Sequence, residues 1–416
     1  MQTVAEPVAQ ATQLENDAAE VMASKGVPLT VLMPCLNEER TVGRCVLKAV
    51  AEMARLRITG EVLVVDNGSN DASVAVARAS GARVVVERRR GYGAALRRGF
   101  REARFEYVVF GDCDESYDFN EVGRFVERLR SGADLVIGNR FAGGVLPGAM
   151  PWLHRRIGNP LLSFLVNAMY RVGVGDSQSG MRGMSKTALR AMNLRMSGME
   201  LASEMLIKAS LAGLRIEEIP IILAPDGRDR PPHLRSFRDG WRHLRLMLML
   251  SPLHLFLLPG LLVALIGVCV IPLLLFAGYG QHDGMFGPNL MFTASILSIC
   301  GSQVALLGVL AKMHAAAMDP VFEDRRLGRL TAALSVERGL VTGVALLTAA
   351  AFCGLPVLAR YASSLEVSSP GLWILACTLF VLAVETLFGS FLISIFDMHR
   401  RDDDQPQLEG ANASID

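Results

Sequence analysis

Short apolar runs rich in Val, Ile and Leu alternate with helical stretches in the first half of the chain. The runs are unbroken rather than alternating, which is typical of strands buried on both faces of a parallel sheet. They lie at residues 27–33, 61–66, 83–87, 107–111, 134–138 and 217–222. This βαβ rhythm predicts an α/β domain with a mostly parallel sheet and helices on both faces.

A different pattern begins after residue 250, where four long apolar segments follow one another. They cover residues 253–276, 290–311, 339–358 and 371–396. Each is near the length of about 20 residues that a bilayer crossing requires. The second half therefore predicts a helical membrane domain with four spans.

One ionisable residue, Glu385, falls inside the fourth apolar segment, at about the depth of Gln303 in the second. Ionisable side chains within a membrane are costly and normally have a partner. We therefore expect Glu385 to be hydrogen-bonded to Gln303 and to serve helix assembly.

Charge between the apolar segments predicts their orientation. Residues 278–289 contain no Lys or Arg, residues 312–338 contain five, and His399, Arg400 and Arg401 follow the last segment. Because cytoplasmic loops are enriched in Lys and Arg, this distribution places both termini in the cytoplasm. The first 25 residues lack a basic start and an apolar core, so no signal peptide is expected there.

The segment between the two halves predicts an amphipathic helix. Phe237, Trp241, Leu244 and Leu248 share one helical stripe, and arginines flank it. Such a helix can lie in the headgroup layer of a membrane, which we favour, or pack on a protein core. We therefore divide the chain into a polar tail (1–26), the α/β domain (27–225), a loop with the amphipathic helix (226–250), the membrane domain (251–400) and an acidic tail (401–416).

Composition excludes several classes of protein. The formal net charge is +1, which gives no reason to expect a nucleic-acid partner. The seven cysteines include no Cys-x-x-Cys pair, so neither a disulfide framework nor a zinc site is expected.

Polar residues follow nearly every predicted strand. Asp112 and Asp114 come directly after the run at 107–111, and two carboxylates on a turn can share one divalent cation and the phosphates that it carries. Because the carboxyl ends of parallel strands meet at one edge, a larger set of polar residues should converge there. This set comprises Asn37, Glu38, Asp66, Asp71, Asp112, Asp114 and Arg140.

A glycine pair at Gly91 and Gly93 opens a helix, where backbone N–H groups can hold a phosphate. The spacing is not Gly-x-Gly-x-x-Gly and the preceding strand is the third, so a dinucleotide-binding fold is disfavoured.

Four motifs together carry a family resemblance. They are Pro34-x-x-Asn37-Glu38, Asp66-Asn-Gly-Ser69-x-Asp71, Gly91-Tyr-Gly-Ala-Ala-Leu and Asp112-x-Asp114. In order and spacing they resemble family 2 glycosyltransferases, and more narrowly the polyprenyl-phosphate glycosyltransferases of the dolichyl-phosphate mannose/glucose synthase group. The resemblance covers about residues 27–245 and implies a GT-A-like fold for the α/β domain.

The resemblance implies roles for individual residues. Asp112 and Asp114 would hold Mg²⁺ or Mn²⁺, and Asp114 would thereby take part in catalysis. Asp176 would act as a base or orient the acceptor. The residues implied in nucleotide binding are Pro34, Asn37, Glu38, Asp66, Ser69, Gly91 and Asp112. Those implied in binding the acceptor phosphate are Arg140, Arg155 or Arg156, and Ser236, with Arg228 or Arg230 facing the site from the same loop as Ser236.

By this resemblance the chain would be an integral membrane enzyme, expected in a bacterial inner membrane with a cytoplasmic catalytic domain. It would move one sugar from a nucleotide sugar, with UDP-glucose preferred, to a polyprenyl phosphate by inverting, metal-dependent displacement. Transfer to another lipid, a processive polysaccharide synthase and an inactive membrane scaffold are the alternatives. The Gln-x-x-Arg-Trp motif of processive synthases is missing. Bacterial members commonly have two membrane spans, whereas this chain has four. The second pair could serve homo-oligomer contacts, acceptor entry or binding of another protein.

Overall fold

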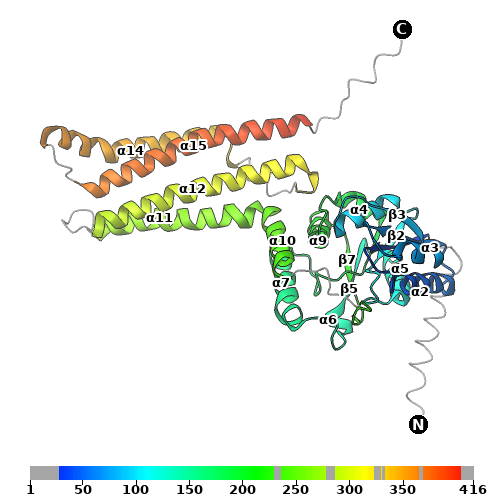
Figure 1. Ribbon diagram of the computed structural model, residues 1–416. Coiled ribbons are helices and arrows are strands. Elements are labelled where there is room, and N and C mark those ends of the chain that lie inside the picture. The colour runs from blue at the N-terminus through cyan, green and yellow to red at the C-terminus, as the bar shows by residue number, and fades with distance from the viewer. Residues whose placement is uncertain are drawn as a thin grey trace, which may run out of the picture. The chain divides into compact units, whose positions relative to one another are not determined.

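The computed structural model describes residues 28–228, 236–277, 286–322, 329, 333–364 and 369–403. The chain divides after Met247 into two compact units, one built around a sheet and one built of long helices (Figure 1).

Within the described residues of the first unit, seven strands form one sheet in the order β3-β2-β1-β4-β6-β5-β7. The bounds are β1 (Leu29–Cys35), β2 (Gly60–Asp66), β3 (Arg83–Val86), β4 (Tyr107–Phe110), β5 (Leu135–Asn139), β6 (Arg182–Ser185) and β7 (Ile216–Pro220). β1 pairs in parallel with β2 and β4, and β5 with β7, whereas β6 runs antiparallel between β4 and β5. The mostly parallel, GT-A-like sheet is confirmed. β6 was missed because Arg-Gly-Met-Ser is not an apolar run.

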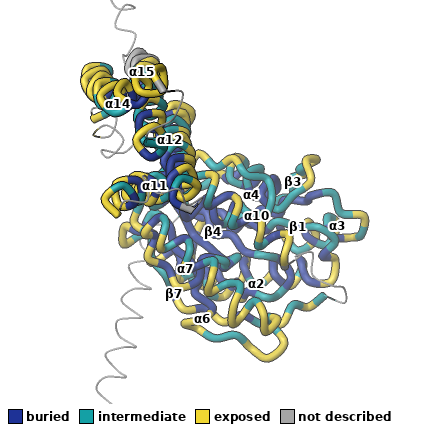
Figure 2. Tube along the Cα trace, turned by 90° about the vertical axis from the view of Figure 1, so that its left-hand side faces the viewer, coloured by how far each residue is buried: buried dark blue, intermediate teal, exposed yellow. Residues whose placement is uncertain are grey.

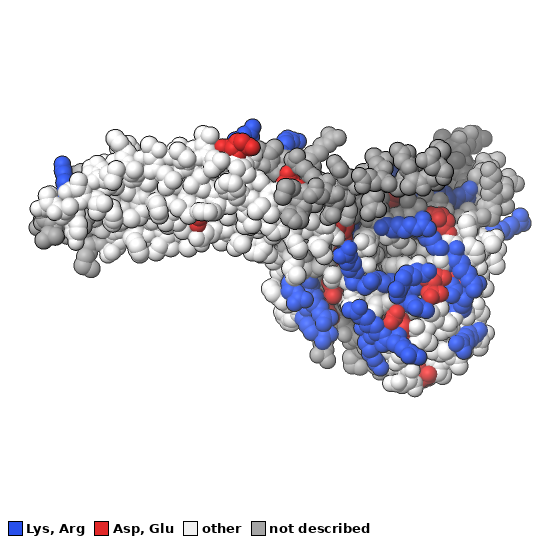
Figure 3. Space-filling view, turned by 90° about the horizontal axis from the view of Figure 1, so that it is seen from above, with Lys and Arg blue, Asp and Glu red and all other residues white. Residues whose placement is uncertain are grey.

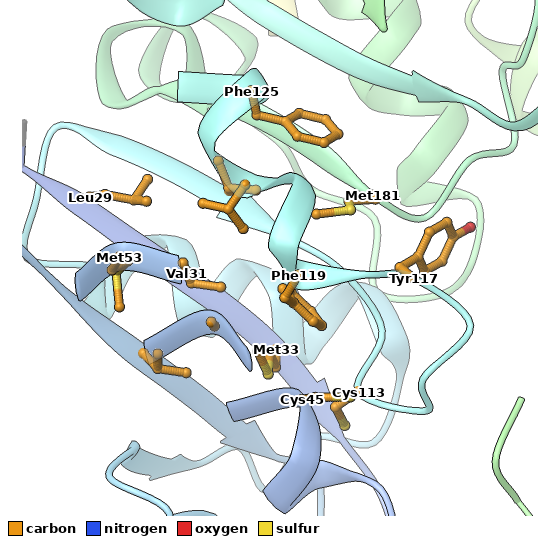
Figure 4. Close-up of a cluster of buried hydrophobic side chains, with 14 of the residues drawn as sticks. Leu29, Val31, Met33, Cys45, Met53, Cys113, Tyr117, Phe119, Phe125 and Met181 are labelled. Carbon is orange, nitrogen blue, oxygen red and sulfur yellow. The ribbon is translucent and has the colours of Figure 1, made fainter. Parts of the chain in front are cut away.

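Alternate residues of β1 support two layers of helices. Leu29, Val31 and Met33 join a buried cluster with α2 (Val42–Arg55) and α5 (Val122–Arg130) (Figure 4). On the other face, Leu32 lies against Gly99 of α4 (Tyr92–Glu102), where an added Cβ would be 2.3 Å from the leucine Cδ1. The sheet is therefore buried on both sides, as its unbroken apolar strands require.

The remaining elements of the first unit connect the strands or follow the last of them. They are α3 (Ser73–Ala79), η1 (Phe119–Glu121), α6 (Arg140–Gly143), η2 (His154–Gly158), α7 (Asn159–Tyr170), α8 (Lys186–Met192), α9 (Leu201–Leu211) and α10 (Ser236–Met249).

The amphipathic segment forms α10, and its aromatic stripe is not the packed side. Phe237 and Trp241 are exposed, whereas Asp239 and His243 are buried against the sheet domain. The Tyr170 hydroxyl of α7 donates a hydrogen bond of 2.6 Å to the Met247 carbonyl. Leu246 and Met247 are buried on this helix as well. The alternative in which the aromatic stripe packs on a protein core is wrong for Phe237 and Trp241, because the helix packs through a different set of residues.

The second unit contains η3 (Leu253–Leu257), α11 (Leu258–Phe276), α12 (Phe286–Met318), η4 (Pro320–Phe322), α14 (Val336–Ser364) and α15 (Pro370–Asp403). In the described part of the chain, four helices are long and apolar enough to cross a membrane, as expected. Figure 2 shows exposed residues along the outer sides of α14 and α15, and Figure 3 shows few charged side chains on this unit. Exposed apolar surface on helices of this length is typical of a membrane-spanning domain.

The intramembrane carboxylate has a different partner from the one expected. Glu385 of α15 accepts a hydrogen bond from the Ser302 hydroxyl of α12, while Gln303 is exposed. A second polar pair, Ser295 with Thr378, joins the same helices at 2.7 Å. The depth of Glu385 was anticipated correctly, but adjacent helical residues point about 100° apart, so its partner was misassigned.

Small residues bring α11 and α12 into backbone contact. A Cβ at Gly301 would lie 2.2 Å from the Ala264 nitrogen, and one at Gly260 would lie 2.5 Å from the Ala305 nitrogen. Close approach at small residues is a principal means of helix association in membranes.

We therefore expect Gly301→Ile to destabilise the helical unit by about 3 kcal/mol, because backbone atoms cannot rotate away from the added side chain. The measurement is the thermal unfolding midpoint of the full chain in detergent. Cys300→Ile is the matched control, since Cys300 is exposed on the same helix. Equal midpoints for the two variants would contradict the packing.

Candidate functional site

Two loops at the carboxyl ends of β1 and β2 are hydrogen-bonded to each other. The Asn37 N–H donates to the Ser69 hydroxyl at 2.8 Å, and the Asn37 side-chain oxygen accepts from the Asn70 N–H at 2.8 Å. Asn37 has a φ of 57°, a left-handed conformation that asparagine tolerates better than most residues. The expected convergence of these two strand ends is therefore present.

Asp66 and Asn67 shape the turn after β2. The buried Asp66 carboxylate accepts hydrogen bonds from the backbone N–H groups of Gly68 and Ser69 at 3.1 Å. The Asn67 amide donates to the Glu87 and Arg89 carbonyls at 3.0 and 2.9 Å and accepts from the Gly91 N–H at 2.8 Å. Asn67 was missed from the sequence, although it stands inside the Asp66–Asp71 motif.

Gly91 is required by geometry. Its φ is 138°, and a Cβ there would lie 2.2 Å from the Ser197 carbonyl oxygen. Only glycine fits this close backbone approach at the start of α4.

A cavity of about 410 Å³ lies over these loops. Of the residues expected to bind a nucleotide, Pro34, Glu38, Gly91 and Asp112 line it, and Asn67 joins them. Asn37, Asp66 and Ser69 do not line it and instead hold the loops that do. Arg90 and, from α10, Arg238 and Arg242 also line the cavity, which the sequence did not indicate.

The carboxylate pair lies at the end of β4. Burial, followed by the charge of Asp114, raises the pKa of Asp112 to about 7, although a hydrogen bond from Tyr92 opposes the rise. Arg228 contacts Asp114 and lies 3.4 Å from a Glu38 carboxylate oxygen. Arg228 is therefore the arginine near the carboxylate pair, of the two candidates expected from the loop before Ser236. The other candidate, Arg230, lies outside the described residues.

A second cavity, of about 350 Å³, extends from the same carboxylates toward Arg140. Arg140 is buried and holds Asp176 through its Nε and Nη2 atoms at 2.7 and 2.8 Å and through its backbone N–H at 3.1 Å. Asp176 is fully buried, so its carboxylate orients Arg140 rather than facing the cavity.

Glu218 of β7 supports this pair and was not singled out from the sequence. Its carboxylate accepts from the backbone N–H groups of Gly175 and Asp176 at 3.0 Å and from the Asn139 amide at 3.1 Å. It therefore fixes the loop that carries Asp176 beside the strand that carries Asn139.

Tyr117 lines the second cavity together with the carboxylate pair and Arg140. Figure 4 shows it at the margin of the apolar cluster, and its hydroxyl accepts a 2.8 Å hydrogen bond from the Gly180 N–H. A Cβ at Gly180 would lie 2.8 Å from an Asp112 carboxylate oxygen. The loop at residues 177–180 therefore lies against the carboxylate pair.

The other residues implied at the acceptor side are less enclosed. Arg155 and Arg156 lie in η2 and are exposed, while the neighbouring His154 lines the cavity. Ser236 begins α10, and its side chain lies outside the described residues.

From α10, His243 enters the second cavity. Its Nδ1 atom is 2.8 Å from the Ser203 hydroxyl of α9. Burial, assisted by the charge of Arg182, lowers the pKa of His243 to about 4, against the influence of Glu200 and Asp239.

The depressed pKa of His243 predicts a stability change with pH. The unfolded chain protonates this histidine near its ordinary pKa of about 6.5, whereas the folded chain resists protonation until about 4. The contribution is complete above about pH 6.5 and is lost as pH falls toward 4, in total about 3 kcal/mol. Thermal unfolding of the full chain in detergent from pH 7.5 to 4.5 measures it. His243→Gln should flatten the dependence, and parallel curves would contradict the assignment.

Comparison with known proteins gives two family matches. Residues 30–192 match the model described as "Glycosyl transferase family 2", and residues 309–397 match "Glycosyltransferase family 2 C-terminal transmembrane region". The chain is 36% identical over 370 residues to the "Low-salt glycan biosynthesis hexosyltransferase Agl6" of Haloferax volcanii, covering 88% of each protein. It is 30% identical over 193 residues to the "Dolichyl-phosphate hexose transferase" of the same organism, covering 46% of this chain and 81% of that protein.

Among solved structures, glucosyl-3-phosphoglycerate synthase from Mycobacterium tuberculosis in complex with Mn²⁺, UDP and glucosyl-3-phosphoglycerate is similar, with 25% identity and a TM-score of 0.43. The match covers 56% of this chain and 81% of that one. With the two family matches and a relative aligned over most of its length, this chain belongs to glycosyltransferase family 2 and is an integral membrane glycosyltransferase with a GT-A-like domain.

Proposed function

We propose that the protein transfers one hexose from a nucleoside diphosphate sugar to a membrane polyprenyl phosphate, with inversion at the anomeric carbon. The observation that carries the proposal is the position of Asp112 and Asp114, which line both cavities. One cavity has the loop residues Pro34, Glu38 and Asn67, and the other has Arg140. A donor diphosphate at the carboxylates would therefore point its sugar toward the acceptor side.

The carboxylate pair fits a divalent cation. Asp112 has a raised pKa because burial and Asp114 both disfavour its negative charge, and a bound cation would relieve this cost. Among the described residues, no three Asp, Glu, His or Cys side chains gather in a metal-binding arrangement. Asp112 and Asp114 would therefore hold Mg²⁺ or Mn²⁺ together with diphosphate oxygens and water. The cation would supply charge neutralisation for the leaving diphosphate.

Donor binding would use the first cavity. Pro34, Glu38 and Gly91 would contact the nucleotide, with Asn37, Asp66 and Ser69 holding the loops in place. Arg228 would exchange its contact with Asp114 for the diphosphate when the cation binds, since both compete for the same carboxylate. UDP-glucose is our proposed donor.

Acceptor binding would use Arg140, one of Arg155 and Arg156, and Ser236. Because Asp176 takes one edge of the Arg140 guanidinium, it fixes the direction of the remaining N–H groups. A lipid phosphate is already anionic near neutral pH, so orientation by Asp176 is more useful than proton abstraction. Attack by a phosphate oxygen on the anomeric carbon forms one C–O bond, and the bond to the nucleoside diphosphate breaks.

Exposed apolar side chains surround η2 and α7, next to these arginines. They are Trp152, Leu153, Ile157, Leu161 and Phe164. With Phe237 and Trp241 of α10, they supply the aromatic and apolar surface that an interfacial segment needs. This surface supports a lipid acceptor, as does similarity to a protein named a dolichyl-phosphate hexose transferase.

We further propose a bacterial inner-membrane location with the catalytic domain and both termini in the cytoplasm. The support is the concentration of Lys and Arg in residues 312–338 and 399–401. The domain limits given from the sequence (27–225, 226–250 and 251–400) remain our proposed functional divisions. Homo-oligomer contacts are one proposed use of the second pair of spans.

Metal dependence is the direct test of this proposal. We expect EDTA, Asp112→Asn and Asp114→Asn each to lower sugar transfer to polyprenyl phosphate by at least about 100-fold, because charge on the leaving diphosphate loses its partner. The assay uses purified full-length protein, labelled UDP-glucose and lipid extraction. Asp118→Asn is the control, since Asp118 is exposed and lies outside both cavities. Transfer that survives EDTA and both substitutions would refute the proposal.

A second test separates the two exposed arginines. We expect either Arg155→Ala or Arg156→Ala to raise the KM for polyprenyl phosphate about tenfold, through loss of a charge-assisted hydrogen bond, with an unchanged KM for the donor. Arg78→Ala, on an exposed position of α3, controls for loss of positive charge. If neither variant changes the acceptor KM, the phosphate contact must lie elsewhere.

A further inference from the structure

The second cavity continues past the carboxylate pair to a polar end that the proposed reaction has not yet used. This end is formed by three parts of the chain: the loop at residues 177–180, the start of α9 and the buried face of α10. Arg182 joins the loop to α9, because it donates to the Ser179 carbonyl at 3.0 Å and to the Ala202 carbonyl at 2.8 Å. The total volume of about 350 Å³ is in the range of small-molecule sites.

Ser179 is the clearest sign that a ligand belongs here. It lines the cavity and is only 1% exposed, and its hydroxyl has no hydrogen-bond partner among the described residues. Buried hydroxyl groups nearly always have a partner, because leaving one unsatisfied is unfavourable. The next residue, Gly180, is packed against Asp112. Ser179 is therefore adjacent in sequence to a residue that contacts the carboxylate pair.

His243 offers a second polar group from α10. Its Nδ1 atom is occupied by the Ser203 hydroxyl, which fixes the ring and leaves Nε2 for another group. The histidine lines the same cavity as Ser179.

Glu200 and Glu204, one helical turn apart, do not belong to this polar end. Glu204 is buried and accepts from the backbone N–H groups of Arg195 and Met196 at 2.9 and 2.8 Å, so it is structural. Glu200 lines neither cavity, and its carboxylate lies against Gly198, where a Cβ would be 2.3 Å from Oε2.

We propose that Ser179 and His243 form the subsite that binds the hydroxyl groups of the transferred sugar, and that α10 thereby helps to select the donor. This inference rests on the proposed function, because the sugar reaches the subsite only if its diphosphate is held at Asp112 and Asp114. The chemistry of the two groups suits a hexopyranose, because a serine hydroxyl and an imidazole nitrogen can both form hydrogen bonds with sugar hydroxyl groups.

The subsite gives a role to a polar group on the buried side of α10. Asp239 and His243 are 3% and 5% exposed, and they share that side with Leu246 and Met247. Asp239 lies 3.6 Å from Arg238 and from Arg242, whereas His243 lines the cavity. A site built to bind a hydroxyl group discriminates strongly against analogues that lack it.

Ser179→Ala is the first test, because it removes one buried atom that has no partner. We expect the unfolding midpoint to stay unchanged or rise, since an unsatisfied polar group is removed. We also expect the KM for the nucleotide sugar to rise about tenfold while the affinity for the free nucleoside diphosphate stays unchanged. Ser210→Ala is the control, because the Ser210 hydroxyl is satisfied by the Tyr170 carbonyl at 2.8 Å and does not line the cavity.

The second test pairs variants with altered donors. Full-length wild type, Ser179→Ala and His243→Gln are each titrated with UDP, UDP-glucose and UDP-glucose analogues that lack one hydroxyl group. When one particular hydroxyl group is removed from the donor, the affinity of wild type should fall about tenfold. The variant that lacks the partner of that hydroxyl group should bind the analogue and UDP-glucose equally well.

The outcomes separate the two proposals. If wild type binds neither UDP nor any UDP-sugar and transfers no sugar, the proposed function fails and the subsite with it. If wild type binds UDP-glucose but both variants weaken the binding of UDP and UDP-glucose equally, or change neither, the subsite alone is overturned. A lower unfolding midpoint for Ser179→Ala with an unchanged donor KM would likewise assign Ser179 a purely structural role.

Discussion

Parallel pairing of β1 with β2 and β4 is the constraint on which the rest of the structure depends. The register pairs Cys35 with Asp66 and Leu32 with Phe110, so the three strands end at the same edge of the sheet. Polar residues follow within two positions of each strand end, at Asn37, Asn67 and Asp112. Asn37, Asp66 and Asp112, separated by 29 to 75 positions in sequence, become neighbours in this way. Local secondary-structure propensity cannot bring these residues to one edge, because their positions depend on how the strands pair.

Many polar side chains at this edge form hydrogen bonds within the protein and leave little capacity for a ligand. Asp66 is satisfied by the backbone of its own turn, Asn67 ties that turn to Gly91, and Glu218 secures the loop before Asp176. Such groups make a site rigid before substrate arrives, and rigid placement lowers the cost of binding in a productive geometry. The side chains left to face the cavities are correspondingly few. This division also explains why a motif residue can matter without touching substrate.

The helix α10 joins the two chemical environments of this enzyme. Its buried face carries Asp239 and His243 into the cavity, while its exposed face carries Phe237 and Trp241. Its sequence leads, after Met249, directly into the first apolar helix. Leu246 and Met247 share the buried face, so the helix packs on the sheet domain through apolar as well as polar contacts. The exposed aromatic residues fit the interfacial position that we propose for this helix.

The sequence by itself determined the alternation of strands and helices, the carboxylate pair after β4 and the four apolar spans, because each depends on periodicity or on residues adjacent in the chain. It also anticipated that the strand ends would meet, since parallel strands share a direction. Only the tertiary structure decided which polar residues face a cavity. Asp176 is closed off by Arg140, and Glu385 accepts a hydrogen bond from Ser302. Asn67 and Glu218 hold loops of the site, and Ser179 and His243 line the second cavity. Those outcomes depend on side-chain direction and on partners far away in sequence, and a linear pattern of residue types carries neither.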